Sequence, residues 1–354
     1  MKKRDILKKQ GLLSLMLMGI MATLALGFST YTLSDEDWLP AWHVPMAGDS
    51  HGQPMVPHDG LVGVADAIFT PPQISEASEA VGQAPSIASR LQPLTDTQLE
   101  NLHNFNYLTN RIFLVDPETI LLPTDINVYS FLAADLTINT NVTGPQVLIF
   151  HTHSGEMFID SDPAQPMTGV MGTGRYLAEI LANTHGIETM HYTGRFDFVD
   201  GRSMRPGAYE RMEPVIKQIL ADNPSIQVVI DLHRDGVGAH HGAFVRDING
   251  KETAQIMFFN GLSRHNRGGQ GVDIAHLPNP YQFENLNFSF RLQLAANQLY
   301  PGLARRVYLR AFRYSLHMLP LSTLVEVGNQ FNTRAQANNA MYPLANIIAA
   351  VVLQ

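Results

Sequence analysis

A chain of 354 residues that is 45% hydrophobic and 16% charged is long enough for one large domain or two ordinary ones with a substantial core. Its formal net charge of -8 argues against a general nucleic-acid-binding protein, because such a chain lacks the basic surface that neutralises phosphates. The sequence contains no cysteine. Disulfides, thiolate zinc sites and cysteine nucleophiles are therefore excluded, and any metal has to be bound by His, Asp or Glu.

The N-terminus carries a charge asymmetry that is typical of a membrane anchor. Basic side chains are concentrated in residues 1–10, an apolar run occupies residues 11–28, and no further Lys or Arg occurs before Arg90. This pattern predicts a cytoplasmic segment at 1–10 and a single transmembrane helix at 11–28, near the lower length limit of about 20 residues. A cleaved signal peptide is the alternative, but the small-residue cleavage site is poorly formed, which favours an uncleaved anchor. We therefore expect a cell-membrane protein whose remaining chain is extracytoplasmic.

A change of pattern near Thr95 predicts where the folded domain begins. Residues 29–94 are rich in Pro, Gly, Ser, Ala and acidic side chains, which is typical of an extended extracytoplasmic tether. Residues 95–108 resemble the start of a capped helix, and residues 121–139 favour extended structure. We expect a catalytic domain over residues 95–354.

Strand-like and helix-like segments alternate through the C-terminal part of the chain. The expected strands are 147–150, 187–193, 226–233 and 322–329, and the expected helices are 172–185, 208–224, 287–301 and 333–352. Strands separated by helices of this length indicate crossover units. The predicted fold class is α/β, with a layered mixed or mostly parallel sheet flanked by helices.

Potential metal ligands follow three of the apolar strands. The segments "VLIFHTHSGE", "VVIDLHRDG" and "TLVEVGN" contain His151, His153, Glu156, His233 and Glu326. Sites in open α/β sheets form where the carboxyl ends of strands converge, so we expect these side chains at one mouth. Two imidazoles and one carboxylate with an open position are typical of catalytic zinc, and a second carboxylate is suited to move protons.

Sequence position leaves two ligand choices open. His151 and His153 are two residues apart and share one side of an extended strand, so one of them binds metal while the other makes a hydrogen bond, or both bind. Glu156 competes with Glu179 on the following helix as the acidic ligand, and its spacing to the histidines favours Glu156. His233 also fits a salt bridge in a charged loop.

Glu326 and Arg234 are the candidate catalytic residues. A carboxylate between Val325 and Val327 on an apolar strand is costly to bury without a purpose. A structural ion pair with Arg234 or Arg313 is the alternative. Arg234 follows His233, and its fork of donors suits a clamp on a substrate carboxylate or a tetrahedral oxyanion.

In combination, four motifs resemble a known family. "VLIFHTHSGE", "IDLHRDG", "ENLNFSFRLQLAANQLYPGLARR" and "LVEVGNQFNTRAQANNA" occur in this order after an N-terminal apolar segment, and the chain resembles stage II sporulation protein P over residues 95–354. The resemblance implies a zinc-dependent peptidoglycan hydrolase with a fold like those of the cell-wall N-acetylmuramoyl-L-alanine amidases and zinc exopeptidases. It implies cleavage of the N-acetylmuramoyl-L-alanine amide and of peptide cross-links during engulfment of the forespore. The implied partners are stage II sporulation proteins D and M.

The resemblance also implies roles for single residues. It favours His153 over His151 as the first histidine ligand, makes His233 the second, and makes Glu326 the catalytic carboxylate. The glutamate that the related amidases take from the following helix has no counterpart at the expected place, so Glu156 is the expected substitute. Two other functions compete: an anchored peptidoglycan-binding scaffold that does not cut, and an endopeptidase or carboxypeptidase acting only on stem peptides.

Overall fold

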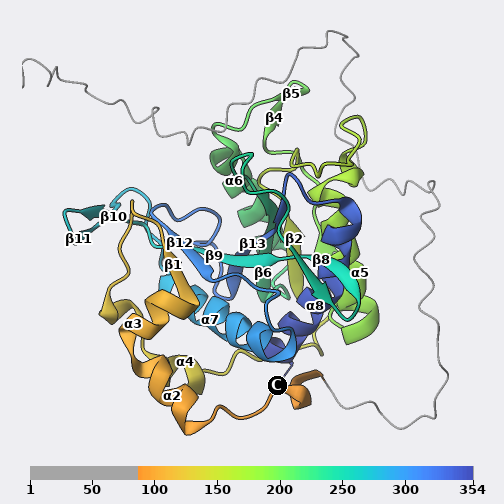
Figure 1. Cartoon of the computed structure of the whole chain (residues 1–354). Coiled ribbons are helices and arrows are strands. Elements are labelled where there is room, and N and C mark those ends of the chain that lie inside the picture. Colours follow the sequence, from red (N-terminus) through yellow and green to blue (C-terminus); the bar gives the residue numbers. More distant parts are fainter. Residues whose placement is uncertain (1–86, 354) are drawn as a thin grey trace, which may run out of the picture. The chain divides into compact units, whose positions relative to one another are not determined.

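The computed structural model describes residues 87–353 (Figure 1). The predicted cytoplasmic segment, the anchor at 11–28 and the tether as far as residue 86 lie outside the described residues. Within residues 87–353, no helix is long and apolar enough to cross a membrane.

A seven-stranded sheet forms the centre of the described chain, in the order β1-β12-β9-β13-β6-β2-β3. Neighbouring strands are parallel except at β9 and β13, which are antiparallel. The carboxyl ends of β13, β6, β2 and β3 therefore lie at one edge of the sheet. The prediction of a mixed, mostly parallel sheet is confirmed. The strands are β1 (Phe113–Val115), β2 (Val147–Phe150), β3 (Thr189–His191), β6 (Val228–Asp235), β9 (Ile256–Gly261), β12 (Val307–Arg310) and β13 (Ser322–Asn329).

Helices cover both faces of the sheet, as the α/β prediction requires. Helices α5, α7 and α8 pack on one face and α6 packs on the other (Figure 1). The four long helices are α5 (Val170–His185), α6 (Ala208–Asp222), α7 (Gln282–Leu299) and α8 (Arg334–Val352). Shorter helices are η1 (Ile87–Arg90), α2 (Asp96–His103), α3 (Phe105–Tyr107), η2 (Leu108–Ile112), η3 (Pro123–Asp125), α4 (Val128–Ala133) and η4 (Pro166–Thr168).

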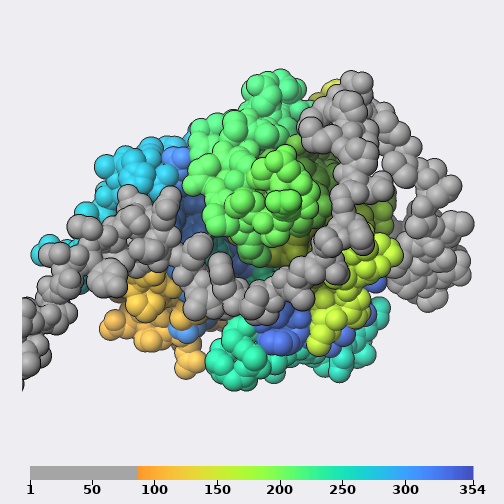
Figure 2. Space-filling view, turned by 90° about the horizontal axis from the view of Figure 1, so that it is seen from above, coloured from red at the N-terminus to blue at the C-terminus, as the bar shows by residue number. Residues whose placement is uncertain are grey.

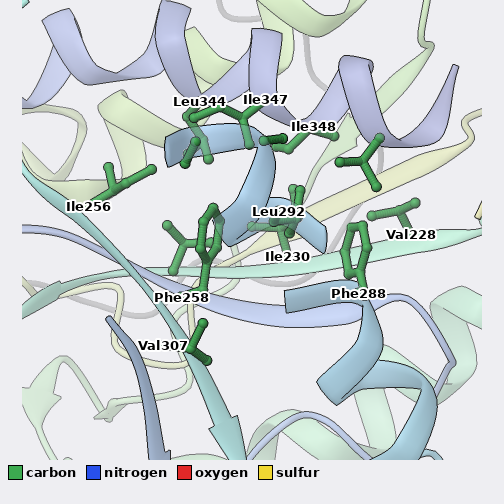
Figure 3. Close-up of a cluster of buried hydrophobic side chains, with 14 of the residues drawn as sticks. Val228, Ile230, Ile256, Phe258, Phe288, Leu292, Val307, Leu344, Ile347 and Ile348 are labelled. Carbon is green, nitrogen blue, oxygen red and sulfur yellow. The ribbon is translucent and has the colours of Figure 1, made fainter. Parts of the chain in front are cut away.

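The larger hydrophobic core lies between the sheet and α5, α7 and α8. Figure 3 shows strand side chains of this core facing side chains of α7 and α8. Burying each large apolar side chain contributes about 1.5–3 kcal/mol, so this layer is a main source of stability. The labelled residues are Val228, Ile230, Ile256, Phe258, Phe288, Leu292, Val307, Leu344, Ile347 and Ile348.

Side-chain alternation along β6 directs its polar residues toward the α6 face. Ile230 and Leu232 belong to the larger core, whereas Val229 belongs to the smaller core under α6. Because successive side chains of a strand point to opposite faces, Asp231 and His233 lie on the same face as Val229. The buried polar end of β6 is thereby placed on the α6 side of the sheet.

Of the two predictions made for the chain before β2, the capped helix is confirmed and the extended segment is wrong. The expected capped helix is α2, where Thr95 and Gln98 form a capping box. Residues 121–139 do not form extended structure throughout: they contain η3 and helix α4, because the Asn127 side chain accepts a hydrogen bond from the Ser130 backbone N–H and caps α4.

Three two-stranded hairpins project from this framework. In Figure 1 the hairpin β10–β11 extends to the left of the sheet. The hairpins are β4 (Phe198–Val199) with β5 (Arg202–Ser203), β7 (Val245–Ile248) with β8 (Lys251–Ala254), and β10 (Arg264–Arg267) with β11 (Gln270–Asp273).

Candidate metal centre

His153, Glu156 and His233 form a group that is suited to hold a metal ion. Each offers one ligand atom, and these atoms all lie within 4.8 Å of one another. His153 Nδ1 is 3.5 Å from Glu156 Oε1, and His233 Nδ1 is 3.3 Å from Glu156 Oε2. The Glu156 and His233 side chains are buried, while His153 reaches the surface with 17% of its side chain exposed. The site is therefore open toward solvent on the His153 side.

A buried carboxylate orients His233. Asp231 Oδ1 accepts a hydrogen bond at 2.7 Å from His233 Nε2, so Nδ1 of that ring faces Glu156. Thr152 holds Asp231 in turn, because its backbone N–H and its hydroxyl donate to the two carboxylate oxygens at 2.9 and 2.7 Å. This is the arrangement by which proteins orient a metal-binding imidazole.

His233 and the carboxylates around it shift one another's pKa values in opposite directions. Burial opposes a charge on His233, but the carboxylates of Asp231 and Glu156 outweigh it and hold the pKa of His233 well above its ordinary value. Burial also disfavours ionised Glu156, yet His233, His153 and Arg205 hold the pKa of that carboxyl well below its usual range. The proton on His233 is the one that a metal ion bound there would displace, because a metal ligand has to be a neutral imidazole.

Glu326 lies beside His233 on the neighbouring strand. The two residues are register partners of the parallel strands β13 and β6. Glu326 Oε2 is buried and has no hydrogen-bond partner among residues 87–353. Burial, assisted by the charges of Asp235 and Glu156, raises the pKa of Glu326 to about 8. A carboxylate with a free buried oxygen next to three potential ligands is chemically poised to exchange a proton.

The structure separates His151 from the other predicted ligands. His151 Nδ1 donates a hydrogen bond to the Leu232 carbonyl oxygen at 2.7 Å, and its Nε2 lies 2.9 Å from His191 Nε2. Burial lowers the pKa of His151 to about 4, and burial together with His151 lowers that of His191 to about 3. His151 is therefore a neutral buried ring whose two nitrogens face groups other than Glu156.

The alternative acidic ligand, Glu179, lies on the outside of α5. Its side chain is 54% exposed and is 3.7 Å from Arg175 Nε. Among the residues that the structure describes, Glu156 is the acid grouped with His153 and His233.

Arg234 supports Glu156 through its backbone. Its N–H donates to Glu156 Oε2 at 2.9 Å, and its guanidinium donates to the carbonyls of Met157 and Asp235 at 3.0 and 3.3 Å. Because Arg234 follows His233 on β6, the two side chains leave the strand on opposite faces. The predicted clamp thus has its guanidinium engaged with backbone oxygens.

Arg205 is a site residue that the sequence analysis missed. Its Nη2 donates to Glu156 Oε1 at 2.7 Å and to His153 Nδ1 at 3.0 Å. It belongs to the segment between β3 and α6, which is green in Figure 2 and lies next to the loop after β2. The only sequence signal is a group of arginines in a glycine-bounded loop, which is ordinary for a solvated surface. Glu156 Oε1 and His153 Nδ1, the atoms that accept hydrogen bonds from Arg205 here, are atoms that a metal ion bound by these residues would occupy instead.

The donor set fits Zn²⁺. Zinc binds imidazole nitrogen and carboxylate oxygen at about 2.0–2.2 Å, usually with three protein ligands in catalytic sites. His153, Glu156 and His233 supply that set within 4.8 Å, Asp231 supplies the outer hydrogen bond, and Glu326 brings an unpartnered buried oxygen.

The fold and this site define a layered α/β protein with a candidate metal centre at the carboxyl ends of parallel strands. A sequence model of the family described as Stage II sporulation protein P (SpoIIP) matches residues 76–349. The chain belongs to this family. The curated Stage II sporulation protein P of Bacillus subtilis (strain 168) is 22% identical over 217 residues, which cover 57% of this chain and 50% of that protein. The match thus spans about half the length of that relative.

Solved amidases are among the structures that this chain is similar to. The CwlD amidase from Clostridioides difficile, in complex with the GerS lipoprotein, has a TM-score of 0.36 at 13% identity, covering 58% of this chain and 95% of the amidase. The N-acetylmuramoyl-L-alanine amidase AmiC2 of Nostoc punctiforme has a TM-score of 0.35 at 15% identity, covering 61% and 97%.

Proposed function

We propose that this chain is a zinc-dependent peptidoglycan hydrolase that cleaves the N-acetylmuramoyl-L-alanine amide. The observation that carries the proposal is the group His153, Glu156 and His233 beside Glu326, whose buried Oε2 is unpartnered. Membership of the stage II sporulation protein P family supports a peptidoglycan substrate and a role in sporulation.

Three side chains hold the ion in this proposal. His153, Glu156 and His233 are the ligands, and Asp231 fixes the ring of His233. Zinc bound there supplies a Lewis acid that polarises a carbonyl oxygen and activates water at neutral pH. His151 is not a ligand in this proposal. Its contacts with Leu232 and His191 hold the start of the loop that carries His153 and Glu156.

Glu326 moves the proton. It accepts a proton from the attacking water and returns it to the leaving amine, because it lies beside His233 and has an oxygen free for the exchange. In the protein without metal, the pKa of Glu326 is raised to about 8. A cation held next to this carboxyl favours its ionised form, and so lowers that pKa and makes the carboxylate available as a base at neutral pH.

The cellular setting of the proposal follows from the predicted N-terminal anchor and from the family. We propose that residues 11–28 hold the enzyme in the cell membrane with its catalytic domain outside, and that it remodels the wall during engulfment. Stage II sporulation proteins D and M are the proposed partners.

Two substitutions test the assigned roles. The full-length chain is supplied with zinc and incubated with purified peptidoglycan, its zinc content is measured by atomic spectroscopy, and products are identified by mass spectrometry. Glu326→Gln is expected to retain zinc and to lose turnover by roughly 10²–10⁴-fold, the range for a lost general base. His233→Ala is expected to lose zinc and turnover together. Glu179→Gln, on the exposed face of α5, is the matched control and is expected to change neither.

The products decide between the proposed activity and its competitors. Free stem peptides with glycan stripped of peptide support the amidase. Cleaved cross-links with stems still attached to muramic acid indicate an endopeptidase instead. Intact wall with protein bound to it indicates a scaffold and overturns the hydrolase.

A further inference from the structure

The mouth of the site contains a tyrosine to which the proposed function assigns no role. Tyr209 lies in the first turn of α6, and its ring meets the His153 ring edge to face, with centroids 5.5 Å apart at 81°. A second tyrosine, Tyr314, meets Tyr209 in the same way at 5.4 Å and 76°. The two rings thus form a row beside a predicted metal ligand.

The Tyr209 hydroxyl is a free donor in an acidic setting. Tyr209 is half-buried, and among residues 87–353 its hydroxyl makes no hydrogen bond. This oxygen is not one of the fully buried atoms that lack a partner, so it is accessible to a ligand. Tyr209 lies close enough to Asp231, Glu326 and Glu156 for their charges to act on it. Its phenol O–H is able to donate a hydrogen bond at this end of the site.

The ring of Tyr209 is held from behind. Tyr314 has a φ of 50°, in the left-handed region that bulky side chains rarely adopt. Its ring also meets Phe259 of β9 edge to face, with centroids 4.7 Å apart. Backbone strain of this kind persists where the surrounding structure fixes it and is concentrated at functional sites. The strained turn supports an aromatic row from the sheet to His153.

We propose that Tyr209 is a further catalytic residue, whose hydroxyl donates a hydrogen bond to the carbonyl oxygen of the scissile amide as that oxygen gains negative charge. This inference rests on the proposed hydrolase function. Donors fixed beside a developing oxyanion stabilise the transition state more than the substrate. Arg205 is a second nearby donor, but its Nη2 is engaged with Glu156 and His153 in the metal-free protein, whereas the Tyr209 hydroxyl has no partner among residues 87–353 with or without those contacts.

The test compares Tyr209→Phe with Tyr192→Phe in the full-length, zinc-loaded chain acting on purified peptidoglycan. Tyr209→Phe keeps the ring against His153 and removes only the donor, so kcat is expected to fall about 10²-fold with KM nearly unchanged. Zinc content and the urea unfolding midpoint are expected to stay at wild-type values. Tyr192, whose ring stacks on Phe196 at 5.8 Å, is the control and is expected to leave kcat unchanged.

A second variant keeps the inference testable if removal of the hydroxyl disturbs folding. Tyr209→His restores an N–H donor on a ring and is expected to recover part of the lost kcat. A wild-type kcat in Tyr209→Phe, or a change confined to KM, overturns the role of Tyr209 and leaves the hydrolase standing. Failure of the wild-type chain to cleave peptidoglycan overturns the proposed function, and this inference with it.

Discussion

Glu326 holds its proton over a pH range in which most glutamates are ionised. Its pKa is raised from 4.5 to about 8 by burial and by the charges of Asp235 and Glu156. Lys and Arg side chains ordinarily relieve such a cost, but the Arg305 guanidinium, whose charge acts on Glu326, forms an ion pair with Asp235 at 2.7 Å. The carboxyl therefore depends on a bound cation, or on protonation, to be accommodated.

This shift predicts how the stability of the metal-free protein depends on pH. Between pH 4.5 and about 8 the folded state binds a proton at Glu326 that the unfolded state has released. The free energy of unfolding contributed by this group therefore falls as pH rises through that window. Glu326→Gln removes the titration, so the variant is expected to become more stable relative to wild type as pH rises, with the difference level above about pH 8.

Urea unfolding of both proteins in a chelator, from pH 5 to pH 9, measures this difference. Unfolding free energies that run parallel over the whole range would show that Glu326 is solvated and ordinary in the folded protein. Repeating the series with zinc is expected to shrink the difference, because a cation stabilises the ionised carboxylate.

Gly174 of helix α5 lies against the histidines His151 and His191. A Cβ there would lie 2.6 Å from the His151 ring and 3.1 Å from His191 Nε2. The absence of a side chain lets the helix cover the buried histidine pair, which in turn lies behind the loop that holds His153 and Glu156.

Gly174→Ala is expected to destabilise the protein by about 1–3 kcal/mol, the usual cost of overpacking a core. The steric effect opposes the helix propensity of alanine, which by itself favours the variant by about 1 kcal/mol. Urea denaturation measures the change, and Glu179→Gln on the exposed face of the same helix is expected to stay within about 0.5 kcal/mol of wild type. A Gly174→Ala protein as stable as wild type would mean that the helix has room to move away from the histidines.

In the molecule as a whole, the described core is contained in one stretch of chain. The residues of its two buried clusters lie between Leu102 and Val352. Residues 76–354 also form one compact unit by their internal contacts.

A fragment of residues 76–354 is therefore expected to fold by itself. Its near-ultraviolet circular dichroism and its urea midpoint are expected to match those of the full-length chain, because the fragment retains both described clusters. A fragment that lacks fixed tertiary structure would show that residues 1–75 contribute to the stability of the domain.

Much of this architecture follows from local patterns. Apolar runs bounded by polar residues predict β2, β6 and β13, and the helix-like segments that alternate with the strands predict α5, α6, α7 and α8. The sequence also predicts which strand ends carry ligand chemistry, since polar residues directly after buried strands are costly without a role. The antiparallel direction of β9 is not contained in such patterns, because alternation and length are the same for either direction.

The composition of the site depends on contacts between distant segments. The expectation that His151 and His153 share one side assumes an extended strand, but β2 ends at Phe150 and the chain then turns, so His153 faces Glu156 while His151 faces Leu232 and His191. Arg205 and Tyr209 come from a loop and a helix that only tertiary packing brings to His153. Residue types and strand ends are local properties of the sequence, whereas which of them meet is decided by the crossovers that fold the chain back on its sheet.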